Sequence, residues 1–256
     1  MNIEIELTVK EKNYIMKYLF VLLLLGGTGL VHAQTETAEQ PNCDEIEGLQ
    51  IYAYDFLHTI IPEDYTGEVF YCNEDGKVRT WCNFKDGKRD GLYRQWHDNG
   101  QLEDEGNYKG GGRDGIWRVW YWNGQQLNES NNKDGKKDGL MRVWMINGQL
   151  KREHNYKDGK LDGLVREWHD NGLLEYEGQF KEGKKDGRCK SYYGNGSLEE
   201  LGEHKWNKKI GIWRYYHKIA VKKEQISKKE VYTKIGDGHL ISQKCWDKNG
   251  KKTDCD

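Results

Sequence analysis

The chain has 256 residues, a formal net charge of −2, 31 glycines and a mean hydropathy of −1.00. This length suffices for one elongated domain, but the low hydropathy and the many glycines argue against a conventional large core. Nucleic acid is excluded as an expected partner by the pI of about 6.5 together with the predicted export described next.

Residues 17–33 predict a secretory signal, so residues 1–33 are assigned to a signal segment. Lys17 precedes the apolar run Tyr18 to Leu25, and Val31-His32-Ala33 is a small-residue cleavage site. The run is too short to span a membrane. The pattern predicts an exported protein that is periplasmic, on the outer surface or secreted. Whether Met1 or Met16 is the start stays open.

Residues 34–66 are interpreted as a linker and an N-terminal cap. Ile46, Leu49, Ala53, Phe56 and Ile60 recur at roughly helical spacing, interrupted by Gly48. A cap, formed by a helix or an irregular strand, would cover the open edge of the first repeat and prevent edge-to-edge aggregation.

Residues 67–213 contain tandem repeats of 24 residues. Glycines recur at this interval from Gly67 to Gly211, and a second set follows nine residues behind, from Gly76 to Gly196. Asn-Gly or Asp-Gly in each unit favours a β-hairpin with a two-residue type I′ turn, as at Asn99-Gly100. Loops such as Lys85 to Gly91 would join the hairpins. The predicted fold is all-β: an elongated array of tandem 24-residue β-hairpin repeats in a single twisted sheet, with a short N-terminal cap.

The turn fixes which residues face each other across each hairpin. It places four arginines opposite four glutamates, in the pairs Arg94–Glu105, Arg118–Glu129, Arg142–Glu153 and Arg166–Glu177. It also places an aromatic residue opposite a glycine, in the pairs Gly67–Phe84, Gly91–Tyr108, Gly139–Tyr156 and Gly163–Phe180. Both patterns are known to stabilise sheets.

One column of aromatic and basic residues is the candidate binding face. Its members share two repeat positions, two residues apart, and therefore one face of the sheet. They are Trp96, Trp120, Trp144, Trp168 and Tyr192, with Arg94, Arg118, Arg142 and Arg166. The rings could be a platform for a protein or a sugar, with cation–π contacts to the guanidinium groups. The alternative is that they are the packing of the array itself.

Residues 214–256 are interpreted as a degenerate final repeat and a lysine-rich C-terminal cap. Ala220 stands where the turn glycine is expected, and Asn249-Gly250 arrives six residues late. The lysines, including Lys222 and Lys223, could contact an anionic membrane surface, or they could be a solvated edge protected from pairing.

Six cysteines in an exported chain permit three disulfides. Cys72–Cys82 and Cys245–Cys255 each span a turn, and Cys43 could equally bond Cys72 or Cys82, while Cys189 could stay free. Because Cys72 and Cys82 are expected on different faces, the connectivity stays open.

Catalytic, cofactor and metal sites are not expected. His97 and His169 share a repeat position, but hairpin stacking separates them by roughly 28 Å. The Asp-Gly-Lys-x-Asp-Gly loops lack the alternating carboxylates of a calcium loop. The polar residues are accounted for by the repeat, so the chain is not expected to be an enzyme.

Gly-x-Trp-x-Val-Trp (Gly115 to Trp120), Asn-Gly and Asp-Gly-Lys-Lys-Asp-Gly (Asp134 to Gly139) resemble the bacterial MORN-repeat-variant family. The resemblance covers about Gly67 to Trp213. It implies an extended sheet of hairpins used for binding, without catalysis. Some eukaryotic MORN proteins are linked to membrane lipids, and many bacterial variants are labelled antitoxins; export conflicts with neutralising a cytoplasmic toxin.

The leading hypothesis is a non-catalytic repeat scaffold that binds a protein or another macromolecule at the cell envelope. The alternatives are a surface glycan-binding module using the aromatic column and a membrane-lipid contact through the basic C-terminal end.

Overall fold

The computed structural model describes residues 39–46, 49–52, 61–218, 225–233 and 237–255. In these residues seventeen strands form one sheet, preceded by the short 3-10 helix η1 (Cys43–Glu45). The strands are β1 (Leu49–Tyr52), β2 (Gly67–Cys72), β3 (Val78–Lys85), β4 (Lys88–Trp96), β5 (Leu102–Lys109), β6 (Gly112–Trp120), β7 (Gln126–Lys133), β8 (Lys136–Trp144), β9 (Leu150–Lys157), β10 (Lys160–Trp168), β11 (Leu174–Lys181), β12 (Lys184–Tyr192), β13 (Leu198–Lys205), β14 (Lys208–Tyr216), β15 (Ile226–Tyr232), β16 (Leu240–Trp246) and β17 (Lys252–Thr253).

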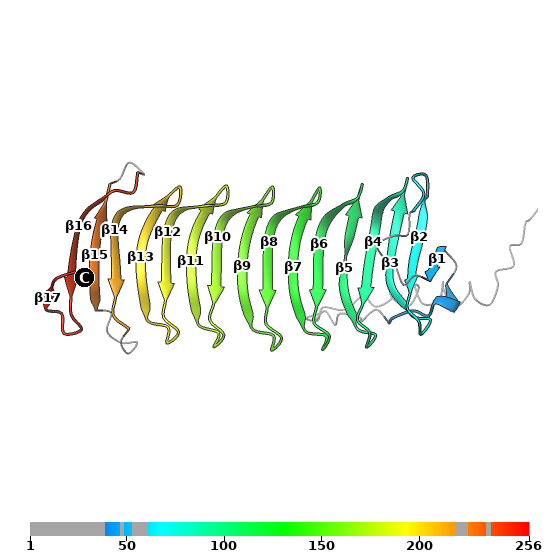
Figure 1. Ribbon diagram of the computed structural model, residues 1–256, viewed down its shortest axis with the longest axis horizontal. Helices are drawn as coiled ribbons and strands as arrows, with labels where there is room; N and C mark the ends of the chain where they lie inside the picture. Colours follow the sequence, from blue (N-terminus) through cyan, green and yellow to red (C-terminus); the bar gives the residue numbers. More distant parts are fainter. Residues whose placement is uncertain (1–38, 47–48, 53–60, 219–224, 234–236, 256) are drawn as a thin grey trace, which may run out of the picture. The chain divides into compact units, whose positions relative to one another are not determined.

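The strands lie side by side in chain order (Figure 1), and from β2 onward each strand is antiparallel to the next. The first pair, β1 and β2, is parallel. The predicted all-β sheet of tandem hairpins is therefore confirmed. The predicted signal segment and both candidate start residues lie outside the described residues. Among the residues that the structure describes, no helix is long and apolar enough to cross a membrane.

The type I′ turns occur at Asp-Gly rather than at Asn-Gly. Asp86 and Gly87 have φ angles of 48° and 69°, and Asp134, Asp158 and Glu182 repeat this left-handed pair with the glycine that follows each. Positive φ at both central residues is the requirement of a type I′ turn. Each stretch that we predicted as a joining loop, such as Lys85 to Gly91, is therefore the end of one strand, a two-residue turn and the start of the next.

The predicted type I′ turn at Asn99-Gly100 is wrong. In this turn Gly100 alone is left-handed, with φ 85°. The Gly100 amide donates to the His97 carbonyl at 2.9 Å, and the His97 amide donates to the Gln101 carbonyl at 2.8 Å. This is a three-residue hairpin turn with a glycine at its end. The Asn99 side chain favours it, because its oxygen accepts the Gln101 amide at 3.1 Å and its nitrogen donates to the Trp122 carbonyl at 2.6 Å.

A β-bulge restores the predicted register beyond this turn. Gln95 lies opposite Asp104 but Trp96 lies opposite Leu102, so Glu103 is an extra residue on β5. The four predicted Arg–Glu pairs are confirmed, with Nε to carboxylate distances of 2.8–3.0 Å. The four predicted glycine–aromatic pairs are confirmed as well.

The sheet has two faces with different side chains. We call one the Trp–Arg face; it carries the predicted column. The other, the Trp117 face, carries a row of buried residues at one repeat position: Tyr93, Trp117, Met141, Val165, Cys189 and Trp213. Near the first strands each face has its own apolar cluster, one containing Val69, Cys82 and Trp117, the other containing Phe70, Val78 and Trp96.

Disulfides are present near both ends of the described sheet. Cys43 bonds Cys72, and Cys245 bonds Cys255. Cys82 and Cys189 are free and buried. The alternative Cys72–Cys82 is wrong because the two residues belong to clusters on opposite faces. At the N-terminal edge, β1 and η1 occupy part of the segment predicted as a helix or irregular strand. Ala220, Lys222 and Lys223 lie outside the described residues.

Candidate binding surfaces

The predicted aromatic column stands on successive strands of the Trp–Arg face. Trp96 is 1% exposed, because it packs with Cys43, Phe70 and Val78. Trp120, Trp144, Trp168 and Tyr192 are only partly buried. Trp96 is therefore covered, whereas the later rings of the column are partly accessible to solvent.

The arginines of this face bind carboxylates rather than forming the cation–π contacts that we predicted within the column. Glu153 accepts from Arg142 at 3.0 Å within its hairpin and from Arg166 at 3.4 Å in the next. Arg94, which also pairs with glutamate, lies 5.8 Å from the ring of Trp81. Partly exposed pairs of this kind contribute about 0.2–1 kcal/mol each. The result is a row of indoles between charge-neutral Arg–Glu pairs.

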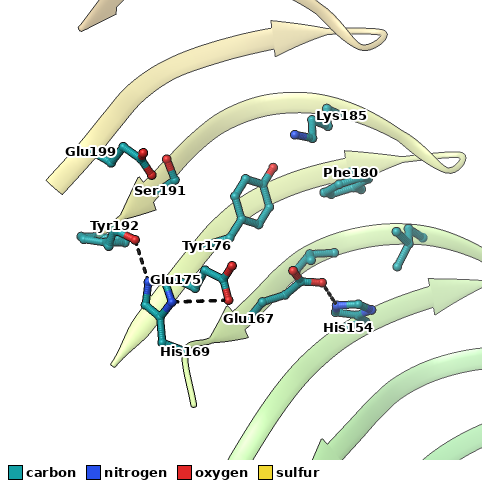
Figure 2. Close-up of a pocket in the computed structure, with 12 residues that line it drawn as sticks. His154, Glu167, His169, Glu175, Tyr176, Phe180, Lys185, Ser191, Tyr192 and Glu199 are labelled. Atoms are coloured by element: carbon teal, nitrogen blue, oxygen red, sulfur yellow. Dashed lines mark hydrogen bonds and ion pairs between the residues drawn. The ribbon is translucent and has the colours of Figure 1, made fainter. Parts of the chain in front are cut away.

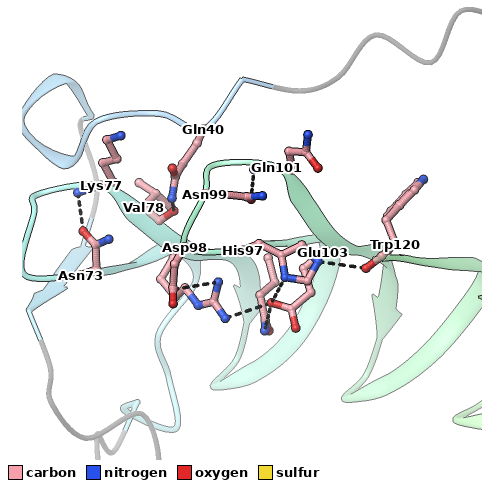
Figure 3. Close-up of polar contacts among 12 residues, drawn as sticks. Gln40, Asn73, Lys77, Val78, His97, Asp98, Asn99, Gln101, Glu103 and Trp120 are labelled. Atoms are coloured by element: carbon pink, nitrogen blue, oxygen red, sulfur yellow. Dashed lines mark hydrogen bonds and ion pairs between the residues drawn. The ribbon is translucent and has the colours of Figure 1, made fainter. Parts of the chain in front are cut away.

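The repeated histidines join neighbouring repeats. His97 Nε2 lies 3.0 Å from the Trp120 carbonyl (Figure 3), and His169 and His217 make the same contact with Tyr192 and Trp246 at 2.8 and 2.9 Å. In two other repeats a tyrosine hydroxyl does so: Tyr121 donates to the Trp144 carbonyl and Tyr193 to the Tyr216 carbonyl. These side chains satisfy backbone groups at the turns. In the described part of the chain no group of three or more His, Cys, Asp or Glu could hold a metal ion.

On the Trp117 face, large residues lie over small ones. Trp117 covers Gly106, where a Cβ would approach the indole to 2.1 Å, and Trp213 covers Gly202 in the same way. Met141 faces Ser130 and Val165 faces His154 in the intervening hairpins. This is the size complementarity that close packing requires.

The complementarity fails at Gly178, which faces the small Cys189. The Tyr176 side chain covers this glycine, since a Cβ there would lie 2.2 Å from the phenol oxygen. A hollow of about 420 Å³, lined in part by Tyr176, lies between β9 and β13 (Figure 2). We call it the central hollow. Leu161, Val165 and Phe180 are among its apolar lining residues.

Polar groups also line the central hollow. His154 is 9% exposed and its Nε2 lies 3.0 Å from the Glu167 carboxylate. His169 lies between the Tyr192 carbonyl and Glu175, with its Nδ1 3.7 Å from that carboxylate. Burial lowers the pKa of His154, so its ring is neutral near pH 7 and leaves the charge of Glu167 uncompensated. Lys185 stands on the other side of Tyr176, 4.9 Å from its ring.

A Cys–His pair lies on the same face as the hollow. Cys189 Sγ is 3.4 Å from His204 Nδ1, and both residues are buried. Burial raises the pKa of the Cys189 thiol to about 11 and lowers the pKa of His204 to about 4. A nucleophilic pair needs the opposite shifts, a thiolate beside an imidazolium. Both shifts therefore oppose a nucleophilic role for the pair near pH 7.

Neither the hollow nor this pair is predicted by the sequence pattern described above. A signal for the hollow's lining was available: Tyr176 breaks the repeat at a position where Asp104 stands in an earlier unit. The signal for the pair was available too, because the predicted register sets Cys189 opposite Gly202, two residues before His204.

Together these features define a class of protein: an open sheet of hairpin repeats in which recurring side-chain contacts join one repeat to the next. The family model that describes the MORN repeat variant matches three stretches, residues 89–109, 161–182 and 185–205. Each stretch covers one hairpin, β4–β5, β10–β11 or β12–β13. The predicted resemblance is confirmed for these repeats, and MORN repeats are generally non-catalytic scaffolds. Bacterial origin, antitoxin function and export stay predictions. A search of curated proteins found no match.

Proposed function

We propose that this protein is a non-catalytic scaffold of the cell envelope that binds a partner protein through the Trp–Arg face. The observation that carries the proposal is the row Trp120, Trp144 and Trp168, whose rings are partly exposed on successive hairpins. Tryptophan and arginine are the residues most enriched at the energetic centres of protein interfaces.

The Arg–Glu pairs favour a protein partner over a strongly charged polymer. Arg118, Arg142 and Arg166 are each neutralised by a glutamate, so the row presents apolar surface with polar edges. Buried interface cores are depleted of net charge in the same way.

Photo-crosslinking at this face in intact cells, followed by purification, tests the proposal. We expect one specific protein to be captured, and we expect Trp120→Ala/Trp144→Ala to abolish its capture. Trp122→Ala is the matched control, because Trp122 is 63% exposed but lies in a turn rather than in the row. Far-UV circular dichroism verifies folding. Equal capture by the folded double variant would refute the proposal.

A glycan is the second candidate, because a row of partly exposed indoles also suits sugar rings. A glycan array probed with the purified chain distinguishes the two, with the same variant and control. A sugar signal that depends on Trp120 and Trp144 favours the glycan.

Envelope location is part of the proposal and is tested by fractionation of cells expressing the tagged full chain. We expect the protein in the envelope or the medium. Recovery in the cytoplasm alone would refute export and would reopen the antitoxin role.

A further inference from the structure

We propose that the central hollow binds an alkylammonium or guanidinium group, supplied either by a free polyamine or by a lysine or arginine of a partner protein. Lining residues such as Val165 lie on the Trp117 face, although Tyr192 of the aromatic column also lines the hollow. The proposal does not depend on the function proposed for the row Trp120, Trp144 and Trp168, none of which lines the hollow.

The lining is rich in negative charge and in hydrogen-bond acceptors. Glu167, Glu175 and Glu199 line the hollow, against Lys185 as the one lysine or arginine of the lining. The Glu199 carboxylate forms no ion pair or hydrogen bond with any residue that the structure describes, and neither does the Ser191 hydroxyl. Glu167 binds the neutral His154, whose second ring nitrogen is then an unprotonated acceptor. A ligand that donates hydrogen bonds and carries positive charge matches this set.

Residues at the same repeat position elsewhere in the chain show which contacts this position can make. Arg79, Glu103, Lys151, Glu175 and Glu199 all occupy one repeat position, at intervals of 24 or 48 residues. Near the first strands, Arg79 reaches Glu103 at 3.0 Å and Asp98 at 3.5 Å. Side chains one repeat apart in this row therefore reach each other, and here one of the two supplies the guanidinium that binds the other's carboxylate.

At the hollow, glutamates occupy the repeat position that Arg79 occupies near the first strands. The residue one repeat before Glu199 is Glu175, so two carboxylates are neighbours where the first repeat has an arginine and a glutamate. Lys151, one repeat further back, binds Asp170 at 2.8 Å instead. Arg152 lies opposite Glu167 in the register, but no ion pair joins these two described residues. Adjacent like charges repel unless a cation lies between them.

The apolar lining suits the carbon stem of such a ligand. Val165, Phe180 and the ring of Tyr176 line the same hollow as the carboxylates. Lysine and arginine bury their methylene stems against apolar surface while the charged end stays with acceptors. A bare inorganic cation would use only the carboxylates.

Titration of the full chain with two probes, spermidine and a hexa-arginine peptide, tests the proposal by calorimetry and by amide chemical shifts. We expect binding with shifts confined to residues around β10 to β13. In Glu175→Gln/Glu199→Gln the affinity should fall about fivefold to tenfold, because two partly exposed charge contacts are lost. The matched control is Glu203→Gln, on the same strand as Glu199 but exposed and outside the hollow.

Binding of spermidine alone supports a free polyamine as the source, and binding of the peptide alone supports a partner's basic residue. Binding of both supports the shared chemistry. The proposal is overturned if neither probe binds, if Glu203→Gln weakens binding as much as the double variant, or if neutral 1,8-octanediol binds as tightly as spermidine.

Discussion

Gly106 is a position where one added methyl group has no room. Its Cβ would lie 2.1 Å from Cε3 and 2.6 Å from Cδ2 of Trp117. The indole has no room to yield, since it is 1% exposed and its Nε1 donates to Asp104 at 2.8 Å. Overpacking of this kind costs about 1–3 kcal/mol. Alanine in place of a strand glycine otherwise gains about 0.5–1 kcal/mol. We therefore expect Gly106→Ala to lower the free energy of unfolding by about 0.5–2 kcal/mol.

Urea unfolding followed by far-UV circular dichroism and tryptophan fluorescence measures this effect. Gly194→Ala is the control, because nothing lies within 4 Å of its Cβ and its φ is not positive; its stability should equal or exceed that of the parent. Replacing Trp117 by valine, the residue found at position 165, should remove most of the penalty of Gly106→Ala. The packing argument fails if Gly106→Ala and Gly194→Ala unfold at the same urea concentration.

Three further predictions follow from the contacts within the sheet. Met145 stands at the repeat position where the Tyr121 hydroxyl bonds the next repeat, so Met145→Tyr should gain a hydrogen bond to the Trp168 carbonyl. The free energy of unfolding, measured in urea, should rise by about 0.5–1.5 kcal/mol in this variant but not in Met145→Phe. Burial lowers the pKa of His204 to about 4 from 6.5, so the unfolded chain binds more protons than the folded chain between these pH values. The contribution of this group to the free energy of unfolding should be complete above pH 6.5 and fall by about 1–3 kcal/mol toward pH 4. His204→Gln should flatten the slope of the free energy of unfolding against pH, and an unchanged slope would contradict the assignment. The Cys189 thiol, with its pKa raised to about 11, should resist a thiol reagent at pH 8 until denaturant is added, and rapid labelling of the native chain would show that it is accessible.

The sequence predicts strand pairing well because two independent patterns agree. The Arg94–Glu105 pair and the Gly91–Tyr108 pair each require the same register, and both are present. Turn type was predicted less well, because Asn-Gly is compatible with more than one turn. The side-chain oxygen of Asn99 favours the three-residue form by accepting the Gln101 amide, and Asn147 accepts the Gln149 amide in the same way.

The candidate site was harder to predict for a related reason. Rows of equivalent residues can be read from the repeat, so the column from Trp96 to Trp168 was found. The lining of the central hollow includes Tyr176, at a repeat position where Asp104 stands in an earlier repeat, and Glu175, which a bulge adds to β11. Averaging over repeats conceals both features. Disulfide choice likewise required knowing that Cys43 reaches the face that carries Cys72.

Contacts such as His97 to Trp120 and Asn99 to Trp122 tie each hairpin only to its immediate successor. Gain or loss of one 24-residue unit would therefore leave every other junction chemically unchanged. The ends of the sheet would move apart or together in steps of about 9–10 Å, two strand spacings. Duplication of a repeat could therefore lengthen the sheet in fixed steps. The central hollow would keep its position relative to the hairpins beside it.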